Sequence, residues 1–349
     1  METISTLTRD SLDQLLEQLA ARLEVDSSAV VPFPDFTEML TALLEFAGQD
    51  QACLWIAGHA SPDVAIATER AGLKAVEILG ASPFVGHPED ILEAAGTSSS
   101  LIYMANPNRV TGSSFSLNHL NRIAQKVSNG LLIIDETYFD YFGITGLPLL
   151  ERHEQVVVLR LFGAGSGNRA DASGCIIGSP RLVSGFKNHY EWSRITGNTH
   201  RLSTSSLTGL DSAGKRVTRI HDEAIRVANC LTQLGLQNRI TSADFLLLRV
   251  ADPREVARFL AEHGSPVDSL DIYPDLAGYL RYKVQSPGNN ETFLIACSRM
   301  PSETYRMADP DKRAVMFHRP GESTPRSHAD PPRSRNRVAG REANPKSGS

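Results

Sequence analysis

Hydrophobic positions recur at helical spacing in the first fifty residues, and short apolar runs typical of strands follow them. Leucines recur at helical spacing over residues 12–23 and predict a first helix that begins by Ser11, with Gln14 completing a capping box. A second amphipathic helix is predicted over residues 36–47, because Gly48 follows its last apolar position. Both helices precede the first run that is typical of a buried strand.

From residue 53 onward, short apolar runs alternate with helical segments. Helices between these runs begin at a proline or end at a glycine, as the segment 62–72 does. This alternation predicts an α/β fold with a mostly parallel sheet and helices on both faces, whose ligands bind at the carboxyl ends of the strands. The runs that predict strands lie at 53–56, 73–79, 100–107, 131–139 and 156–162.

The pattern changes near residue 213. One long helix is predicted over residues 213–235, and strand, helix, strand and helix patterns follow it. We therefore expect a large domain over residues 1–212 and a smaller C-terminal α+β domain over 213–304. Residues 305–349 are rich in Pro, Arg and Ser and predict a disordered basic tail, since residues 301–349 hold ten Lys and Arg against six Asp and Glu.

Charge and composition exclude several classes of function. The chain of 349 residues carries a formal net charge of −5, which gives no electrostatic reason to expect nucleic acid or an anionic membrane as a partner. It has no apolar run of membrane-spanning length and no secretory pattern, so we expect a cytoplasmic protein. The four cysteines are scattered and predict reduced thiols without a metal site; Cys175 is interpreted as a buried small hydrophobe.

Three loops that follow predicted strands carry unusual polar residues. They read ANPNRVTG (105–112), IIDETYFDYFG (133–143) and LRLFGAGSGNRADASG (159–174). Each alone has a local explanation: the first suits a turn, and Asp135 at a strand end suits a helix cap or a loop anchor. The glycines of the third lack the spacing of a dinucleotide-binding fingerprint.

Taken in order, the three loops resemble the class I/II aminotransferases of pyridoxal phosphate (PLP) fold type I, with histidinol-phosphate aminotransferase and threonine-phosphate decarboxylase as the nearest members. That family shows NPNNPTG, DEAYxxF and RTxSKxxGLAGxRxG at similar intervals, and its closing segment resembles YLRYKVQSPGNNETFL in residues 279–294. The resemblance covers about residues 12–300. It implies the α/β fold predicted above, extended by the smaller C-terminal domain.

The resemblance assigns roles to a few residues that this chain retains. Asp135 corresponds to the aspartate that pairs with the cofactor's ring nitrogen, and Tyr138 to the tyrosine that bonds its phenolic oxygen. Arg281 corresponds to the arginine that grips the substrate carboxylate. Asn108 remains as a vestige of the asparagine loop, whereas Arg109 stands where the family has its ring-bonding asparagine.

Other family positions are changed. The Schiff-base lysine corresponds to Ala164, its preceding serine to Gly163 and the phosphate arginine to Ala172. The stacking aromatic falls near Ser61, and the phosphate loop falls on residues 34–37, which read PDFT. The arm that covers the neighbouring active site is also expected to be absent. The resemblance therefore predicts a degenerate cofactor site, with no PLP or only weak, non-covalent binding.

These changes favour a non-catalytic binding, regulatory or scaffold pseudoenzyme of amino-acid metabolism. It would form a homodimer, or a heterodimer with an active relative, and could hold a small amino-acid-like ligand at Arg281. Two enzymatic alternatives stay open: a PLP-independent enzyme that uses Asp135, Tyr138, Arg109 and Arg281, and a true aminotransferase, acting on an amino acid or its phosphate ester, whose lysine lies elsewhere. A decaying reading frame is a further alternative.

Overall fold

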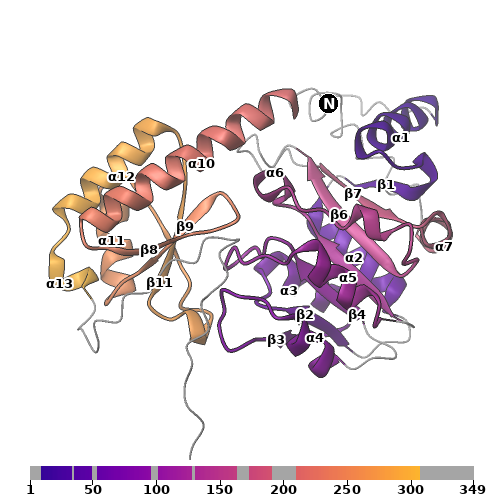
Figure 1. Ribbon diagram of the computed structural model, residues 1–349, viewed down its shortest axis with the longest axis horizontal. Coiled ribbons are helices and arrows are strands. Elements are labelled where there is room, and N and C mark those ends of the chain that lie inside the picture. The colour runs from indigo at the N-terminus through magenta and orange to yellow at the C-terminus, as the bar shows by residue number, and fades with distance from the viewer. Residues whose placement is uncertain are drawn as a thin grey trace, which may run out of the picture. The chain divides into compact units, whose positions relative to one another are not determined.

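The described part of the chain forms one compact unit within residues 1–307. The structure is a computed structural model, and the elements of that unit are shown in Figure 1. It describes residues 9–33, 35–48, 53–95, 101–127, 130–162, 173–190 and 210–306.

A seven-stranded sheet forms the centre of the N-terminal portion. Its strand order is β1-β7-β6-β5-β4-β2-β3, in which β3, β2, β4, β5 and β6 are parallel and β7 is antiparallel to both of its neighbours. The mostly parallel sheet predicted from the sequence is thus confirmed. The strands are β1 (Val30–Phe33), β2 (Cys53–Ala57), β3 (Lys74–Ile78), β4 (Leu101–Ala105), β5 (Leu131–Asp135), β6 (Val156–Phe162) and β7 (Ser173–Gly178).

Helices cover both faces of this sheet because successive strand residues point to opposite sides. Leu54 and Ile56 of β2 belong to one hydrophobic cluster with α2 and α3, whereas Ile102 and Met104 of β4 belong to another with α1 and α5. Helices on both faces were predicted and are confirmed. They are α1 (Arg9–Leu23), α2 (Phe36–Ala47), α3 (Pro62–Arg70), α4 (Pro88–Ala95), α5 (Leu117–Ala124), α6 (Phe139–Phe142) and α7 (Pro180–His189).

Two details at the N-terminal side differ from the sequence prediction. Helix α1 begins at Arg9, so Ser11 lies inside the helix and its interpretation as the start of a capping box was wrong. Strand β1 was not predicted, and it lies at the sheet edge, where Pro32 pairs in register with Cys175. An edge tolerates this proline because no further strand needs its missing N–H.

A four-stranded antiparallel sheet, in the order β10-β11-β9-β8, forms the centre of the C-terminal portion (orange in Figure 1). The predicted boundaries at residues 212/213 and 304/305 stay predictions, and residues 307–349 lie outside the described part. The elements are α10 (Leu210–Gln233), β8 (Gln237–Ile240), β9 (Phe245–Arg249), α11 (Pro253–Glu262), β10 (Asp268–Ser269), β11 (Tyr279–Lys283), α12 (Pro287–Arg299) and α13 (Ser302–Tyr305).

The seven-stranded sheet reverses its direction of growth between β2 and β4. After β2 the chain adds β3 on one side, and it then returns to place β4 on the other side of β2. The loops that follow β2 and β4 therefore separate at the carboxyl ends of these two strands. Sheets of this type bind ligands at such a point. These loops span residues 58–61 and 106–116, and the second contains most of the ANPNRVTG loop (105–112) that the sequence singled out.

Candidate functional site

Asparagine side chains shape the loop that follows β4. Asn108 Oδ1 accepts hydrogen bonds from the backbone N–H groups of Val110 (2.9 Å) and Thr111 (3.0 Å). Its Nδ2 donates to the backbone oxygen of His59 at 3.1 Å, which ties the loop after β4 to the loop after β2. The Asn108 amide therefore has partners within the chain at both its oxygen and its nitrogen.

The same loop approaches the C-terminal portion at its glycine. Gly112 has a φ of +65°, and a Cβ there would lie 2.3 Å from the Cβ of Thr241. The backbone N–H of Ser242 donates to the Gly112 oxygen at 3.1 Å. Both the left-handed backbone and the close approach require glycine, so the last residue of ANPNRVTG has a structural reason to be retained.

Arg109 turns its side chain inward from this loop. The residue is only 5% exposed, and its Nη2 lies 2.7 Å from Asp63 Oδ2 in the first turn of α3. Its guanidinium carbon lies 4.2 Å from the ring centroid of Phe36, the first residue of α2. Among the described residues, Nε and Nη1 of Arg109 have no hydrogen-bond partner although both are buried.

Asp135, the last residue of β5, is 0% exposed and already bonded by its own chain. One carboxylate oxygen accepts from the hydroxyl of Tyr103, and the other accepts from both the hydroxyl and the backbone N–H of Thr137, the latter at 2.8 Å. The related family pattern DEAYxxF has alanine where this chain has Thr137, so one of these donors is an addition. Burial, followed by the charge of Asp135, holds the pKa of Tyr103 well above its usual value.

The charge of Arg109 is stabilised by its acidic neighbours. Burial alone would lower the pKa of the guanidinium, but Asp135, Tyr103 and Asp63 together raise it. Arg109 thus stays cationic, and its ion pair is with Asp63. In the related family, the aspartate that corresponds to Asp135 pairs with the ring nitrogen of the cofactor.

Tyr138, which the resemblance assigns to the cofactor, is buried among aromatic rings. Its ring centroid lies 6.0 Å from that of Tyr141 and 6.2 Å from that of Phe245 in β9. It therefore contributes to packing between segments that are distant in the sequence, whatever else its hydroxyl binds.

The amino end of α2, which corresponds to the family's phosphate loop, is capped by a carboxylate. Asp35 is the N-cap residue, and its Oδ1 accepts from the backbone N–H of Glu38 at 2.9 Å. This side chain supplies the negative charge that a helix N-terminus favours, and it repels a second anion there. Pro34 lies outside the described residues.

Arg281 of β11 has internal partners for each of its guanidinium nitrogens. Nε and Nη2 donate to Asp268 Oδ2 at 3.1 and 2.9 Å, and Nη1 donates to the backbone oxygen of Arg109 at 3.0 Å. The structure thus brings Arg281 next to the Arg109 loop. Its assignment as the grip for a substrate carboxylate remains a prediction.

From its place on a loop, His59 is predicted to lie on a surface turn, but the structure buries it between Asp275 and Glu77, so this prediction was wrong. His59 is 3% exposed, and its Nε2 lies 3.0 Å from Asp275 Oδ2, while its Nδ1 lies 3.6 Å from Glu77 Oε2. Burial would raise the pKa of Glu77, but His59 and the backbone N–H of Ala60 lower it further. In the sequence, only the place of His59 just after a predicted strand could have suggested that it contacts Asp275 and Glu77.

The changed residues of the third loop cannot be placed. Gly163, Ala164 and Ala172 lie outside the described residues, so the absence of a lysine at this position rests on the sequence alone. Cys175, just after that loop, is fully buried, and burial raises the pKa of its thiol to about 12. Such a thiol is a poor nucleophile. Within the described part of the chain, no cluster of His, Cys, Asp and Glu could hold a metal ion.

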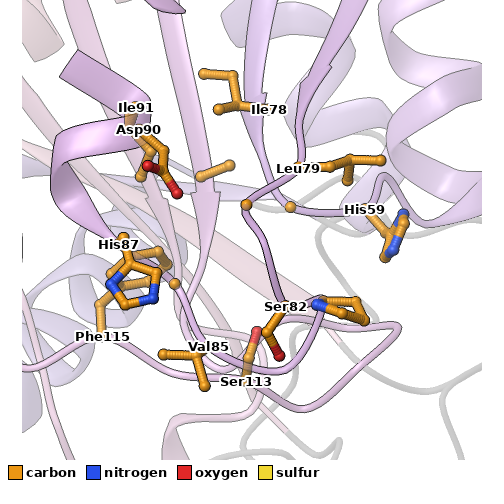
Figure 2. Close-up of a pocket in the computed structure, with 15 residues that line it drawn as sticks. His59, Ile78, Leu79, Ser82, Val85, His87, Asp90, Ile91, Ser113 and Phe115 are labelled. Atoms are coloured by element: carbon orange, nitrogen blue, oxygen red, sulfur yellow. The ribbon is translucent and has the colours of Figure 1, made fainter. Parts of the chain in front are cut away.

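A pocket adjoins the loops after β2 and β4, and His59 is among the residues that line it (Figure 2). Its empty volume is about 410 Å³, including the part open to solvent. His87 and Asp90 lie on one side of it, and Ser113 and Phe115 come from the loop after β4. Arg109 and Asp135 are not among its lining residues, so the pocket and the predicted cofactor position are neighbours, not the same place.

The sheet order and the three loops together define a PLP-dependent aminotransferase fold of type I. The family model described as aminotransferase class I and II matches residues 2–299, and the chain belongs to that family. The described residues include no helix with both the length and the apolar character to cross a bilayer.

Curated relatives agree with this assignment. Histidinol-phosphate aminotransferase 3 of Mesorhizobium japonicum is 26% identical over 226 residues, which cover 64% of this chain and 61% of that protein. The aromatic amino acid aminotransferase of Cutibacterium acnes is 26% identical over 263 residues, covering 73% and 74% of the two chains. This chain spans little more than half of the length of three histidinol-phosphate aminotransferases that it matches, between 54% and 61%.

Solved structures share the fold at lower identity. A structure described as a putative histidinol-phosphate aminotransferase from Erwinia carotovora atroseptica superposes with a TM-score of 0.71 at 19% identity, covering 83% of this chain and 85% of that one. The histidinol-phosphate aminotransferase of Sinorhizobium meliloti, solved in complex with pyridoxal-5'-phosphate, gives 0.68 at 17% identity, covering 82% and 80%.

The described residues do not fit PLP well. The two oxygens of Asp135 already accept three hydrogen bonds within the chain. Asp35 caps the helix that would receive the phosphate. We therefore derive no reaction step through this cofactor.

Proposed function

We propose that this chain is a member of the aminotransferase family that has lost transaminase activity and acts by binding. It would serve as a regulatory or scaffold subunit in amino-acid metabolism, in the cytoplasm, as a homodimer or with an active relative. The observation that carries the proposal is the buried guanidinium of Arg109, which lies against the ring of Phe36 and pairs with Asp63.

Energetic considerations support the loss of the cofactor. A PLP phosphate without its arginine, serine and backbone donors forfeits several charge-assisted hydrogen bonds, each worth about 1.5–3 kcal/mol. Three such bonds amount to roughly 5–9 kcal/mol, or several orders of magnitude in affinity. With Ala164 in place of the lysine, the chain also lacks the amine that acts as nucleophile and proton carrier.

Absorbance spectroscopy tests the proposal directly. The protein as purified, and again after incubation with PLP and dialysis, should show no band near the visible edge and no transamination of amino acids. A double variant, Ala164→Lys with Ala172→Arg, should remain inactive because Arg109 and Asp35 still stand at the cofactor position. A coloured wild-type protein, or activity in the double variant, would show that the site is far less altered than we propose.

A true aminotransferase is the second candidate, and the retention of Asp135 and Tyr138 favours it. In that case a lysine elsewhere would form the Schiff base, and borohydride would fix PLP to that lysine. An enzyme that reuses the pocket without PLP is less well supported, because Arg281 is paired with Asp268, and Asp135 with Tyr103 and Thr137. Its acid and base groups would first have to exchange these partners.

A further inference from the structure

The pocket of Figure 2 is a separate place from the predicted cofactor position, and the proposed function leaves it without a role. Its empty volume of about 410 Å³ includes a part open to solvent, so a small ligand can enter it without passing through packed side chains. The loops after β2, β3 and β4 all contribute to its lining. The pocket therefore lies at the carboxyl ends of three neighbouring strands, where sheets of this type bind ligands.

Large apolar side chains form much of the wall of this pocket. Ile91 and Phe115 are buried, and Phe115 lies so close to Gly86 that a Cβ there would be 2.1 Å from its ring. Leu79 and Val85, by contrast, are 45% and 47% exposed, and both line the pocket (Figure 2). Exposed apolar side chains that gather beside a hollow are typical of a binding site, because the apolar part of a ligand removes them from water.

One carboxylate adjoins these apolar side chains. Figure 2 shows Asp90 of α4 with its carboxylate turned toward the space between the labelled residues. A Cβ at Gly80 would lie 2.7 Å from Asp90 Oδ2, so glycine at this position leaves room for the carboxylate. Among the described residues Asp90 has no ion-pair partner, whereas its neighbour Glu89 pairs with Arg122 at 2.6 Å. The described residues that line the pocket include no Lys or Arg.

We propose that this pocket binds a primary amine that has an apolar body and no acidic group. The ammonium group pairs with Asp90, and the apolar body lies against Leu79, Val85 and Phe115. This inference goes beyond the proposed function and does not rest on it, because it concerns a separate site.

The lining also selects against other ligands. A carboxylate or a phosphate would meet no cationic Lys or Arg there and would be repelled by Asp90. An α-amino acid is disfavoured for the same reason, which separates this ligand from the amino-acid substrates of the family. His59 lines the pocket as well, and its buried Nδ1 has no hydrogen-bond partner among the described residues. As a neutral imidazole it can accept a hydrogen bond from an N–H donor such as an ammonium group.

Calorimetric titration of the full-length protein with benzylamine, benzyl alcohol and benzoate tests this inference. The three probes share an aromatic ring and differ in charge, so the size of the ring cannot explain a difference between them. At pH 8, benzylamine is cationic and an ordinary histidine is neutral. We expect benzylamine to bind about fivefold or more tightly than benzyl alcohol, and benzoate to bind least.

Variants of the pocket separate the charge from the apolar contact. Asp90→Asn should weaken benzylamine binding by about fivefold or more and change benzyl alcohol binding by less than about twofold. Glu89→Gln is the matched control, because it removes the next carboxylate of α4, which does not line the pocket, and it should change benzylamine binding by less than about twofold. Leu79→Ala should weaken the binding of both ligands by about two- to threefold, since it removes apolar surface only.

Asp90 has no ion-pair partner to lose and Leu79 is exposed, so both variants should fold as the wild type does, which circular dichroism checks. The absence of benzylamine binding to the wild type at millimolar concentration would overturn the inference. Benzylamine binding that Asp90→Asn leaves unchanged, or benzoate binding tighter than that of benzylamine, would overturn it as well. None of these results bears on the proposed function, which fails separately if the protein forms a covalent adduct with PLP.

Discussion

Two buried polar clusters, one beside each sheet, differ in how completely they satisfy their hydrogen bonds. In the C-terminal portion, Asn290 of α12 is 0% exposed and makes four hydrogen bonds: Oδ1 accepts from Tyr282 and Gln285, and Nδ2 donates to Glu223 and to the Gln285 backbone. In the N-terminal portion, Arg109 pairs with Asp63 but leaves two buried nitrogens without partners among the described residues.

This difference separates a structural polar group from one that is available for binding. A buried group that has all its partners contributes to the stability and the specificity of the fold, and nothing further is needed to explain it. Unpaired buried donors lower the stability, and they persist where a ligand or water completes them. The two clusters should therefore respond differently to substitution.

Asn290→Leu should produce the largest effect. The substitution leaves the hydroxyl of Tyr282 and the N–H of Gln285 without their acceptor, and we expect the free energy of unfolding to fall by about 2–3 kcal/mol. Urea denaturation followed by circular dichroism measures this change. A loss below about 0.5 kcal/mol would remove the contrast between the two clusters.

Asp35→Ala should have an intermediate effect in the Arg109 region. The side chain caps α2 through the N–H of Glu38, and removal of such a cap costs about 1 kcal/mol. Asp35→Ser keeps a capping oxygen without the charge and serves as the matched control in thermal unfolding. Equal destabilisation by both variants would mean that the charge, not the hydrogen bond, matters at this helix end.

Arg109→Met should lower the free energy of unfolding by less than Asn290→Leu does, despite the deep burial of this side chain. The variant loses the pair with Asp63 but removes two unpaired nitrogens, and its thioether can still pack against Phe36. The same urea experiment measures it beside Asn290→Leu. If Arg109→Met proved the more damaging of the two, Arg109 would be a structural residue and the comparison would be reversed.

The smallest expected effect concerns the acid that contacts His59. Glu77 has a lowered pKa in the folded protein, so its ionised form stabilises the fold above its unfolded pKa, and this contribution is lost as the pH falls through the folded value below 4.5. Its side chain is 33% exposed, and solvent screening keeps the effect below about 1 kcal/mol.

Glu77→Gln should therefore lose less stability than the wild type when the pH is lowered from about 5 to about 3, because the contribution of Glu77 is lost below the ordinary glutamate pKa. Thermal unfolding at several pH values measures the difference. Identical pH profiles would show that Glu77 is not coupled to folding.

Sequence patterns predicted the sheet and the loops that matter, but not how their side chains fill the site. Alternation of strands and capped helices located β2, β4, β5 and β6, because buried parallel strands and helix ends have strong local signals. Strand β1 was missed, since VVPF (30–33) is short, contains a proline and gains its partner only from β7, far along the chain.

The candidate functional site shows the same limit of prediction from sequence patterns. Asp135 and Arg281 were found through motifs, and Arg109 was recognised as a departure from one. That Arg109 would bond Asp63 and lie on Phe36 depends on three segments meeting in space, which no local pattern encodes. The role of Thr137 as a donor to Asp135 is visible only once the turn after β5 is built.

Borohydride reduction after incubation with PLP, followed by intact-protein and peptide mass spectrometry, tests the central claim most directly. If Arg109 holds the cofactor's place and no lysine faces the site, the protein mass should stay unchanged under conditions in which an active aminotransferase is labelled once per chain. One stoichiometric phosphopyridoxyl group on a single lysine would contradict the account.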